Sequence, residues 1–375
     1  MKYCTKCLQP DTRPNSVFSE EGVCPACVYF DAVQDVDWEE RYDILLEIFK
    51  TNPKRKNQFH DCIIGVSGGK DSTRQALFLR DKLGINPLLV TLSYPPEQVT
   101  QRGVENVSNL IELGFDVVIS APAPQTWKKL KHAGFHKFTN SFRSTEMALF
   151  ASVPQIAMKY GIKLILWGEN PGLQVGDMGC LGLTGYDGNS MRNGNTLQSG
   201  TEWMLKEGVP ESSLIAYRYP TEKQFLDHDL QIVYLGWFLG DWSLVNNAAY
   251  SCVNGLEIRT DGVEKTGDLF GATALDEDFT PVNQLIKYYK FGFGRTTEYV
   301  NEEIRLGRME RARGIELIRD YDGTKDDGYI SDYCDYLGIT TELFWEKIRM
   351  ATNKDLFFID KFGAISPRFT VGVGL

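Results

Sequence analysis

The sequence predicts an α/β fold with a parallel, doubly wound sheet, an N-terminal Cys4 zinc ribbon and a mostly helical C-terminal region. Three observations predict it: strand-like and helix-like segments alternate after residue 61, a glycine turn joins the first strand to its helix, and two CxxC pairs precede them. The expected domains are 1–30 (ribbon), 31–60 (helix and linker), 61–275 (the α/β domain, with an insertion at 170–230) and 276–375 (helical region).

Composition and charge limit the classes of function. The 375 residues include 42% hydrophobic and 24% charged residues, which is ordinary for a globular protein. A net charge of −10 and a pI near 5.1 argue against general affinity for nucleic acids or anionic membranes, although a local basic groove is still compatible with them. No apolar run reaches membrane-spanning length, and the N-terminus lacks the apolar core of a signal peptide, so we expect a cytoplasmic protein.

The ribbon is predicted by two cysteine pairs. Cys4 and Cys7 are separated by 16 residues from Cys24 and Cys27, a spacing typical of tetrahedral zinc sites. A metal would also help a module of this size to fold, since it is too small to build a sufficient core. A redox or iron centre is the alternative, whereas a disulfide framework would fit a secreted chain.

The stretch Asp61–Leu83 predicts a phosphate site. An apolar strand leads into the turn Ser67-Gly68-Gly69-Lys70, and apolar residues at helical spacing follow from Asp71 onward. Such a turn directs backbone N–H groups and the positive end of a helix dipole to one point. The stretch is not a Walker A loop, because Ile64 and Asp71 stand where that motif needs Gly and Ser or Thr. The alternative is a chance glycine turn before a structural helix.

Further strands and helices are predicted along the chain. The strands are expected at Pro87–Leu92, Phe115–Ile119, Lys163–Trp167 and Gln231–Leu239, and the helices within 36–50 and at Val99–Leu113, Ser144–Tyr160, Trp242–Val253 and Glu298–Ile318. Ligands of parallel sheets bind at the carboxyl ends of the strands, near the switch point. We therefore expect Leu92 and Ser93 beside the ligand, and Gly168 and Glu169 across the site from the phosphate loop.

Three segments near this cleft have open interpretations. Glu169 follows a buried strand, where it would bind Mg²⁺ or a substrate hydroxyl or amine, or else cap a helix. The Gly- and Asn-rich residues 170–230 lack periodicity and are predicted to form a substrate loop or lid. The stretch Lys287–Glu298 is predicted to be a basic glycine loop, with Lys290 and Arg295 binding phosphate or simply adding surface charge.

The loop SGGKDS, residues 67–72, resembles that of the ATP-pyrophosphatase (PP-loop) superfamily, which includes GMP synthetases, NAD synthetases, asparagine synthetases and tRNA thiolases. The resemblance implies cleavage of ATP between its α and β phosphates, with an adenylated substrate and pyrophosphate as products. The residues implied to bind ATP are Val66, Ser67, Gly68, Gly69, Lys70, Asp71, Ser72, Leu92, Ser93 and Gly168. The implied catalytic residues are Lys70, Asp71, Ser72 and Glu169, with Mg²⁺ near Asp71 and Glu169 and pyrophosphate near Lys290 and Arg295.

Three further features resemble the N-acetyl sugar amidotransferases of surface-polysaccharide biosynthesis. They are the CxxC pairs, the WGEN stretch Trp167–Asn170 and the stretch Lys290–Arg305, and the similarity extends over the whole chain. The resemblance implies conversion of a sugar acetamido group to an acetamidino group, through an adenylate that ammonia displaces. ATP, Mg²⁺ and Zn²⁺ are the expected cofactors, and an N-acetylated sugar, free or nucleotide-linked, is the expected substrate.

The source of ammonia is expected to lie outside the chain. Met178–Gly182 lacks the first glycine of a GxCxG elbow, and no later His-x-Glu follows it, so separate glutaminase and ammonia-channelling subunits are predicted. A tRNA thiolase is the alternative, since some of these enzymes join a Cys ribbon to the same loop; Cys180 and Cys252 would then supply a catalytic pair. The acidic balance counts against a large RNA footprint. A non-catalytic nucleotide-binding scaffold is the third possibility.

Overall fold

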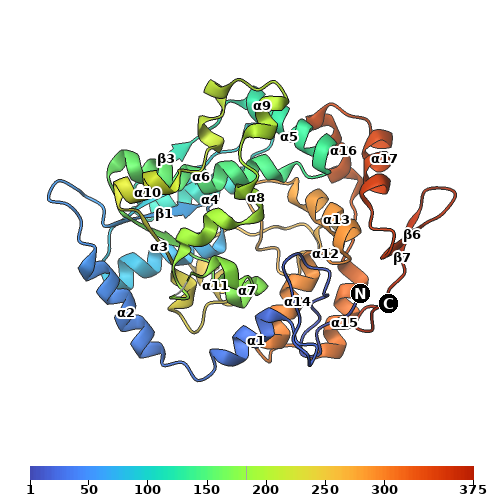
Figure 1. Cartoon of the computed structure of the whole chain (residues 1–375), viewed down its shortest axis with the longest axis horizontal. Helices are drawn as coiled ribbons and strands as arrows, with labels where there is room; N and C mark the ends of the chain where they lie inside the picture. Colours follow the sequence, from blue (N-terminus) through green and yellow to red (C-terminus); the bar gives the residue numbers. More distant parts are fainter. Residues whose placement is uncertain (183) are drawn as a thin grey trace.

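A five-stranded parallel sheet forms the centre of the molecule (Figure 1). The computed structural model describes residues 1–182 and 184–375. The strands are β1 (Cys62–Val66), β2 (Pro87–Leu92), β3 (Val117–Ser120), β4 (Leu164–Trp167) and β5 (Gln231–Tyr234), in the order β3-β2-β1-β4-β5. The predicted parallel α/β sheet is therefore confirmed.

Helices cover both faces of this sheet because side chains alternate along each strand. Ile64 of β1 joins a core with α2 (Trp38–Thr51), α3 (Lys70–Leu83) and α4 (Gln101–Glu112). Ile63 faces the other way, toward α6 (Phe142–Tyr160) and α10 (Glu222–His228). The sheet is thus doubly wound, and its central strands are buried except for half-buried Gly65 and Trp167, as their apolar runs predict.

The topological switch point lies between β1 and β4. From β1 the chain proceeds outward to β2 and β3, and it then returns to β4 and β5 on the other side of β1. Ile64 of β1 pairs with Leu166 of β4, so the turn that follows β1 and the residues that follow β4 meet at one edge. This is the edge at which open α/β sheets bind their ligands.

A second hydrophobic core joins the helix that follows β3 to the C-terminal region. It packs α5 (Pro124–Phe138) against α13 (Thr280–Phe291), α16 (Asp327–Leu337) and α17 (Thr341–Ala351), with the rings of Phe135 and Phe344 stacked at 5.7 Å. The sequence analysis did not predict α5. Its apolar residues are interrupted by lysines and histidines, and Pro124 suggests a loop although proline is well suited to the first helical turn.

The predicted helix Glu298–Ile318 is wrong, since the structure has two helices here, α14 (Arg295–Arg305) and α15 (Arg311–Tyr321). Gly307 adopts a φ of +68° in the connection, which ends the first helix. Gly314 lets the two helices pack closely, because a Cβ at this position would lie 2.6 Å from Cγ1 of Val300. The hairpin of β6 (Phe357–Ile359) and β7 (Ile365–Pro367) was not predicted either.

Short helices occupy most of the Gly- and Asn-rich stretch, in which Leu183 lies outside the described residues. They are α7 (Pro171–Val175), η1 (Met178–Cys180), η2 (Gly188–Asn193), α8 (Asn195–Gln198), α9 (Glu202–Lys206), η3 (Glu211–Ser213) and η4 (Ile215–Tyr217). The predicted fifth strand ends at Tyr234 and continues as η5 (Leu235–Trp237), followed by α11 (Leu244–Val253) and α12 (Val263–Thr266). The role of this stretch as a substrate loop is still a prediction.

The N-terminal ribbon and α1 (Pro25–Ala32) lie beside the C-terminal region, and the two ends of the chain are neighbours (Figure 1). The Leu375 N–H donates to the Met1 carbonyl at 3.1 Å. The domain boundaries at residues 30, 60 and 275 are still predictions. Within the ranges 1–182 and 184–375, no helix has the length and apolar character needed to cross a membrane.

Candidate active site

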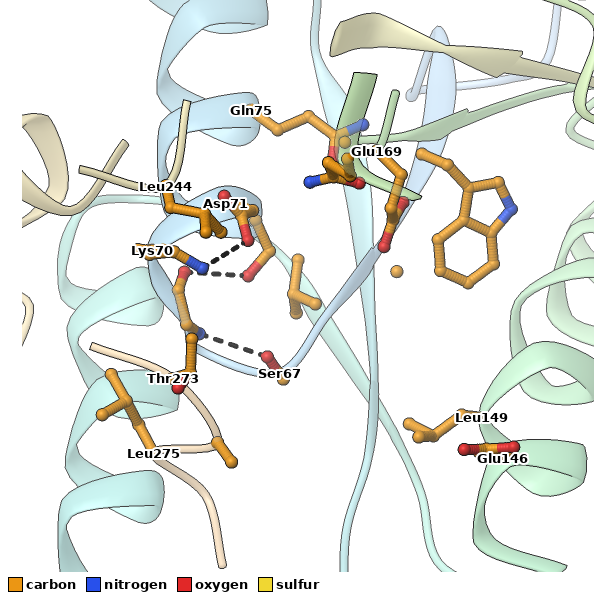
Figure 2. A pocket seen from close by; sticks show the side chains of 18 of the residues that line it. Ser67, Lys70, Asp71, Gln75, Glu146, Leu149, Glu169, Leu244, Thr273 and Leu275 are labelled. Atoms are coloured by element: carbon orange, nitrogen blue, oxygen red, sulfur yellow. Dashed lines mark hydrogen bonds and ion pairs between the residues drawn. The ribbon is translucent and has the colours of Figure 1, made fainter. Parts of the chain in front are cut away.

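A cavity of about 510 Å³ opens at the carboxyl ends of β1, β2 and β4. Its walls come from the turn after β1, the residues after β4, one side of α6, the loop at Ala272–Leu275 and α14. In Figure 2, Lys70 and Asp71 lie on one wall with Ser67, and Glu169 points into the same space from the other. The volume is within the range of small-molecule sites.

The phosphate loop requires its glycines. Gly68 has a φ of +75°, and a Cβ there would lie 3.0 Å from Cβ of Asn106 and from N of Val107. Gly69 is the N-cap of α3 and has no side chain to occupy the first N–H groups of the helix. These donors are therefore available to an anionic ligand, together with the positive end of the helix dipole.

Helix α11 fixes the Lys70–Asp71 pair. The Lys70 side chain is 5% exposed, and its Nζ lies 2.8 Å from Oδ2 of Asp71. Oδ1 of Asp71 accepts a hydrogen bond from Nδ2 of Asn247 at 2.6 Å, and the Lys70 carbonyl accepts one from Oγ of Ser251 at 2.6 Å. A held ammonium of this kind is suited to contact phosphate oxygens.

Glu169 has an unusual protonation equilibrium. Its side chain is accessible from the cavity although protein surrounds it, and burial, aided by the nearby charge of Asp71, raises its pKa from 4.5 to about 7. A backbone hydrogen bond and Lys70 act in the opposite direction. A carboxyl that titrates near neutral pH can give or take a proton during a reaction.

Three further polar residues of the cavity were not predicted. Glu302 of α14 accepts the Leu244 N–H at 2.5 Å, and burial raises its pKa. Glu146 of α6 accepts a hydrogen bond from Oγ1 of Thr196 at 2.7 Å, and burial raises its pKa as well. Gln75 is 1% exposed, and its Nε2 has no hydrogen-bond partner in the described part of the chain.

Helical periodicity was available as a signal for two of these residues. Gln75 lies four residues after Asp71, and Glu302 seven after Arg295, so each shares a helix face with a predicted site residue. Nothing in the sequence marks Glu146, which lies in a helix whose other residues are mostly apolar.

The carboxylates of the cavity fit a magnesium ion that would be shared with a phosphate ligand. Asp71, Glu169 and Glu302 all line the cavity, but the only three- or four-ligand cluster in residues 1–182 and 184–375 is the cysteine cluster. Mg²⁺ is usually held by one or two carboxylates plus substrate phosphates and water, so a preformed cage is not needed.

The structure brings most of the predicted site residues together. Those that line the cavity are Val66, Ser67, Gly69, Lys70, Asp71, Ser72, Leu92, Gly168, Glu169 and Arg295. Gly68, Ser93 and Lys290 do not line it. Lys287 and Lys290 belong to α13 and not to the predicted glycine loop, and Lys290 donates to the carbonyls of Phe138 and Thr139 at 2.6 and 2.9 Å.

The four ribbon cysteines form a cluster that could hold a metal ion, and zinc as that metal is still a prediction. The Sγ atoms of Cys4, Cys7, Cys24 and Cys27 are buried and lie within 4.8 Å of one another. Backbone N–H groups of Gln9 and Cys24 donate to Sγ of Cys7 and Cys4 at 3.3 and 3.2 Å. Four thiolates suit a tetrahedral metal.

The ribbon supports two walls of the cavity. The Leu8 N–H donates to Oδ1 of Asn301 on α14 at 2.8 Å. On the other side α1 packs against α7, where a Cβ at Gly176 would lie 2.6 Å from N of Ala26. Helix α7 carries Gln174 and Val175 into the cavity wall, so the ribbon packs directly behind residues that line the site.

The isolated cysteines do not resemble activated nucleophiles. Cys180 and Cys252 do not line the cavity. The Cys180 thiol lies 3.4 Å from Oδ2 of Asp177, and burial raises its pKa to about 12. A thiol with a raised pKa carries little thiolate at neutral pH, and the thiolate is the reactive form.

Comparison with known proteins identifies one sequence similarity and several weak structural ones. Residues 268–366, about a quarter of the chain, match the family described as LPS biosynthesis protein WbpG-like, C-terminal domain. No curated protein sequence matches the chain significantly.

Three solved structures with partial similarity have names that refer to nucleotide synthesis or to tRNA. NMN synthetase from Francisella tularensis is 18% identical over 36% of this chain and 56% of its own, with a TM-score of 0.28. A predicted subunit of tRNA methyltransferase from Methanocaldococcus jannaschii is 16% identical over 51% and 73% (TM-score 0.27). U34-tRNA thiolase NcsA from Methanococcus maripaludis, with its 4Fe–4S cluster, is 12% identical over 68% and 80% (TM-score 0.24). The aligned region spans little more than half of the synthetase, and scores this low carry no argument about function.

Substitution of Glu169 tests its raised pKa. Because the native carboxyl retains its proton to about pH 7, the ligand-free protein loses stability as the pH rises from about 4.5 to about 7. Glu169→Gln cannot ionise, so we expect it to melt at a higher temperature than the wild type at pH 8, with a smaller difference at pH 5. Glu47→Gln, on the exposed surface of α2, is the control. A difference that does not change with pH would contradict the shift.

Substitution of Cys27 tests the metal centre. We expect the purified protein to contain about one zinc ion per chain by elemental analysis, and Cys27→Ser to lose it and to melt at a lower temperature, because the cluster stabilises the ribbon. Cys252→Ser, an exposed and isolated cysteine, should keep both properties. Iron with acid-labile sulfide in place of zinc would contradict the assignment of the metal.

Proposed function

We propose that the protein is a cytoplasmic, ATP-dependent amidotransferase that converts the acetamido group of an N-acetylated sugar into an acetamidino group. The reaction would release AMP and pyrophosphate and would serve the synthesis of a surface polysaccharide such as lipopolysaccharide. Zn²⁺ in the ribbon and Mg²⁺ with the nucleotide complete the proposed cofactor set.

One observation carries the proposal: the SGGKDS loop and the WbpG-like segment line the same cavity. The residues of 268–366 that line it are Ala272, Thr273, Ala274, Leu275, Arg295, Glu298 and Glu302. The segment whose similarity points to lipopolysaccharide synthesis therefore shares its site with the loop whose geometry suits phosphates. Adenylation of a glycan precursor combines the two features.

In the first step the sugar amide oxygen attacks the α-phosphate of ATP. Lys70 and the N–H groups at the start of α3 would bind the β- and γ-phosphates, and their charge stabilises the departing pyrophosphate. Asp71 and Glu169 would hold a Mg²⁺ ion, which would add to this neutralisation. The product is an O-adenylated imidate, whose C–O bond is weakened because AMP is a good leaving group.

In the second step ammonia attacks the imidate carbon, and AMP departs with the former amide oxygen. The attacking nitrogen must lose a proton, and Glu169, with a pKa of about 7, is suited to accept it. The amidinium product is a cation, so Glu169, Asp71 and Glu302 would also stabilise the positive charge that develops on the acceptor.

We propose that a separate glutaminase and an ammonia-channelling subunit supply the ammonia. The chain offers no activated thiol at the described cavity wall, and the Cys180 thiol has a raised pKa. A tRNA thiolase is disfavoured on the same ground, since Cys180 and Cys252 do not reach the cavity in which ATP would bind.

Substitution of Lys70 tests the ATP chemistry. We expect Lys70→Ala to lower the release of AMP and pyrophosphate about a hundredfold or more while the fold is kept, because the ammonium contacts the leaving group. Circular dichroism checks the fold. Lys82→Ala, an exposed lysine on the same helix, is the matched control and should keep full turnover. Unchanged turnover in Lys70→Ala would contradict the proposed site.

A panel of acceptors tests the reaction class. With ATP, Mg²⁺ and ammonium, mass spectrometry of N-acetylated nucleotide sugars should show replacement of one oxygen by NH in a single member of the panel. Glutamine in place of ammonium should give no product without the partner subunits. Sulfur incorporation into tRNA, with all sugars unchanged, would instead support the thiolase.

A further inference from the structure

Three cations from three separate segments surround one carboxylate beside the cavity. Glu298 of α14 lies 3.0 Å from Nη2 of Arg13, 2.8 Å from Nζ of Lys287 and 2.9 Å from Nη1 of Arg295. Arg13 comes from the ribbon, Lys287 from α13 and Arg295 from the first turn of α14. All four side chains are between 14% and 23% exposed, so solvent screens them only in part.

The cluster carries an excess of positive charge. Glu298 offsets one of the three cations, and the three together hold its pKa far below the usual range despite its burial. Two more carboxylates lie near Arg295 and reduce this excess, and each also accepts backbone N–H groups. Asp322 accepts from Gly294 at 2.8 Å, and Asp268 accepts from Gly271 at 3.0 Å.

The four residues differ in their access to the cavity. Arg295 and Glu298 line it, whereas Arg13 and Lys287 do not. A ligand in the cavity would therefore contact Arg295, and the other two cations would act through Glu298. Without them Glu298 would neutralise Arg295, since an ion pair at 2.9 Å leaves no net charge for a ligand.

The ribbon fixes the position of Arg13. Its guanidinium packs over the ring of Phe293 at 4.7 Å, and its Nε donates to Oε1 of Gln9 at 3.1 Å. Gln9 also accepts a hydrogen bond from Nδ2 of Asn301 at 3.2 Å and lies two residues beyond Cys7 of the cysteine cluster. The ribbon backbone thus determines where the Arg13 charge is held.

We infer that the ribbon completes an anion site in the cavity: Arg13 and Lys287 are positioning residues that offset Glu298, so that Arg295 can bind a diphosphate group. The inference rests on the proposed function for the identity of that group. Two sources share the chemistry, namely the pyrophosphate that leaves ATP and the diphosphate of a nucleotide-linked sugar.

Binding of inorganic pyrophosphate to the intact protein, measured by calorimetry without turnover, tests the inference. We expect Arg13→Ala and Lys287→Ala each to weaken binding about tenfold and Arg13→Lys to retain much of it, because charge loss at this range is only partly screened. Glu298→Gln should have the opposite effect and strengthen binding. Arg313→Ala, an exposed residue with the same change in charge, is the control.

The same variants separate the two sources. UDP binding is measured with a non-hydrolysable ATP analogue present. If Arg13→Ala weakens the binding of UDP alone, the site binds the diphosphate of the acceptor. If it weakens the binding of pyrophosphate alone, the site binds the leaving group. Metal content and melting temperature check that the ribbon is intact. Lys287→Ala tests the effect of losing one charge while the ribbon sequence is unchanged. Unchanged affinity for both probes in Arg13→Ala and Lys287→Ala, or weaker binding in Glu298→Gln, would overturn the inference. Neither result depends on AMP release, so a failure here is distinct from a failure of the proposed reaction.

Discussion

The ion pair of Lys70 and Asp71 at the start of α3 is the interaction on which the rest of the site depends. Breaking a fully buried pair of this kind costs about 3–5 kcal/mol, and the cost is lower here because Asp71 is 34% exposed, so the pair is held in place before any ligand arrives. Asn247 and Ser251 of α11 fix both residues from outside the loop. If phosphates replaced the carboxylate as partner of the ammonium, the exchange would free Asp71 to contact a metal. A preorganised cation at the end of β1 therefore links the fold to the proposed chemistry.

The ribbon packs against two helices that form the cavity wall. It contacts α7 through α1 and contacts α14 through Leu8 and Gln9, and these two helices form opposite parts of the cavity wall. The ribbon thereby contacts side chains some 300 residues away in the sequence, and a metal held by its four cysteines would stabilise these contacts. The ribbon, a small module without much apolar core, is thus packed against two walls of the cavity at the edge of the sheet.

Local patterns predicted the centre of the molecule well and its periphery poorly. The apolar run at Cys62–Val66 and the glycines after it predict a strand, a turn and a helix, because these features are determined by neighbours in the chain. The break in Glu298–Ile318 depends on Gly307 and on the packing of Gly314 against Val300, which is a tertiary contact. Glu146 and the partnership of Arg13 with Glu298 also arise from contacts between distant segments, so no local pattern reveals them. Lys290 is the opposite case, because a local pattern pointed to the wrong role. Its glycine neighbours suggested a phosphate loop, but the residue lies in α13 and its side chain donates to carbonyls at the end of α5.

The central claim is that the acceptor amide oxygen attacks the α-phosphate of ATP in this cavity. An acceptor labelled with ¹⁸O in its acetamido carbonyl tests the claim directly, because the oxygen must follow the bond that forms. The account predicts that the label appears in the phosphate of AMP, with none in pyrophosphate. Label that stays in the sugar, or that appears in inorganic phosphate alongside ADP, would contradict it.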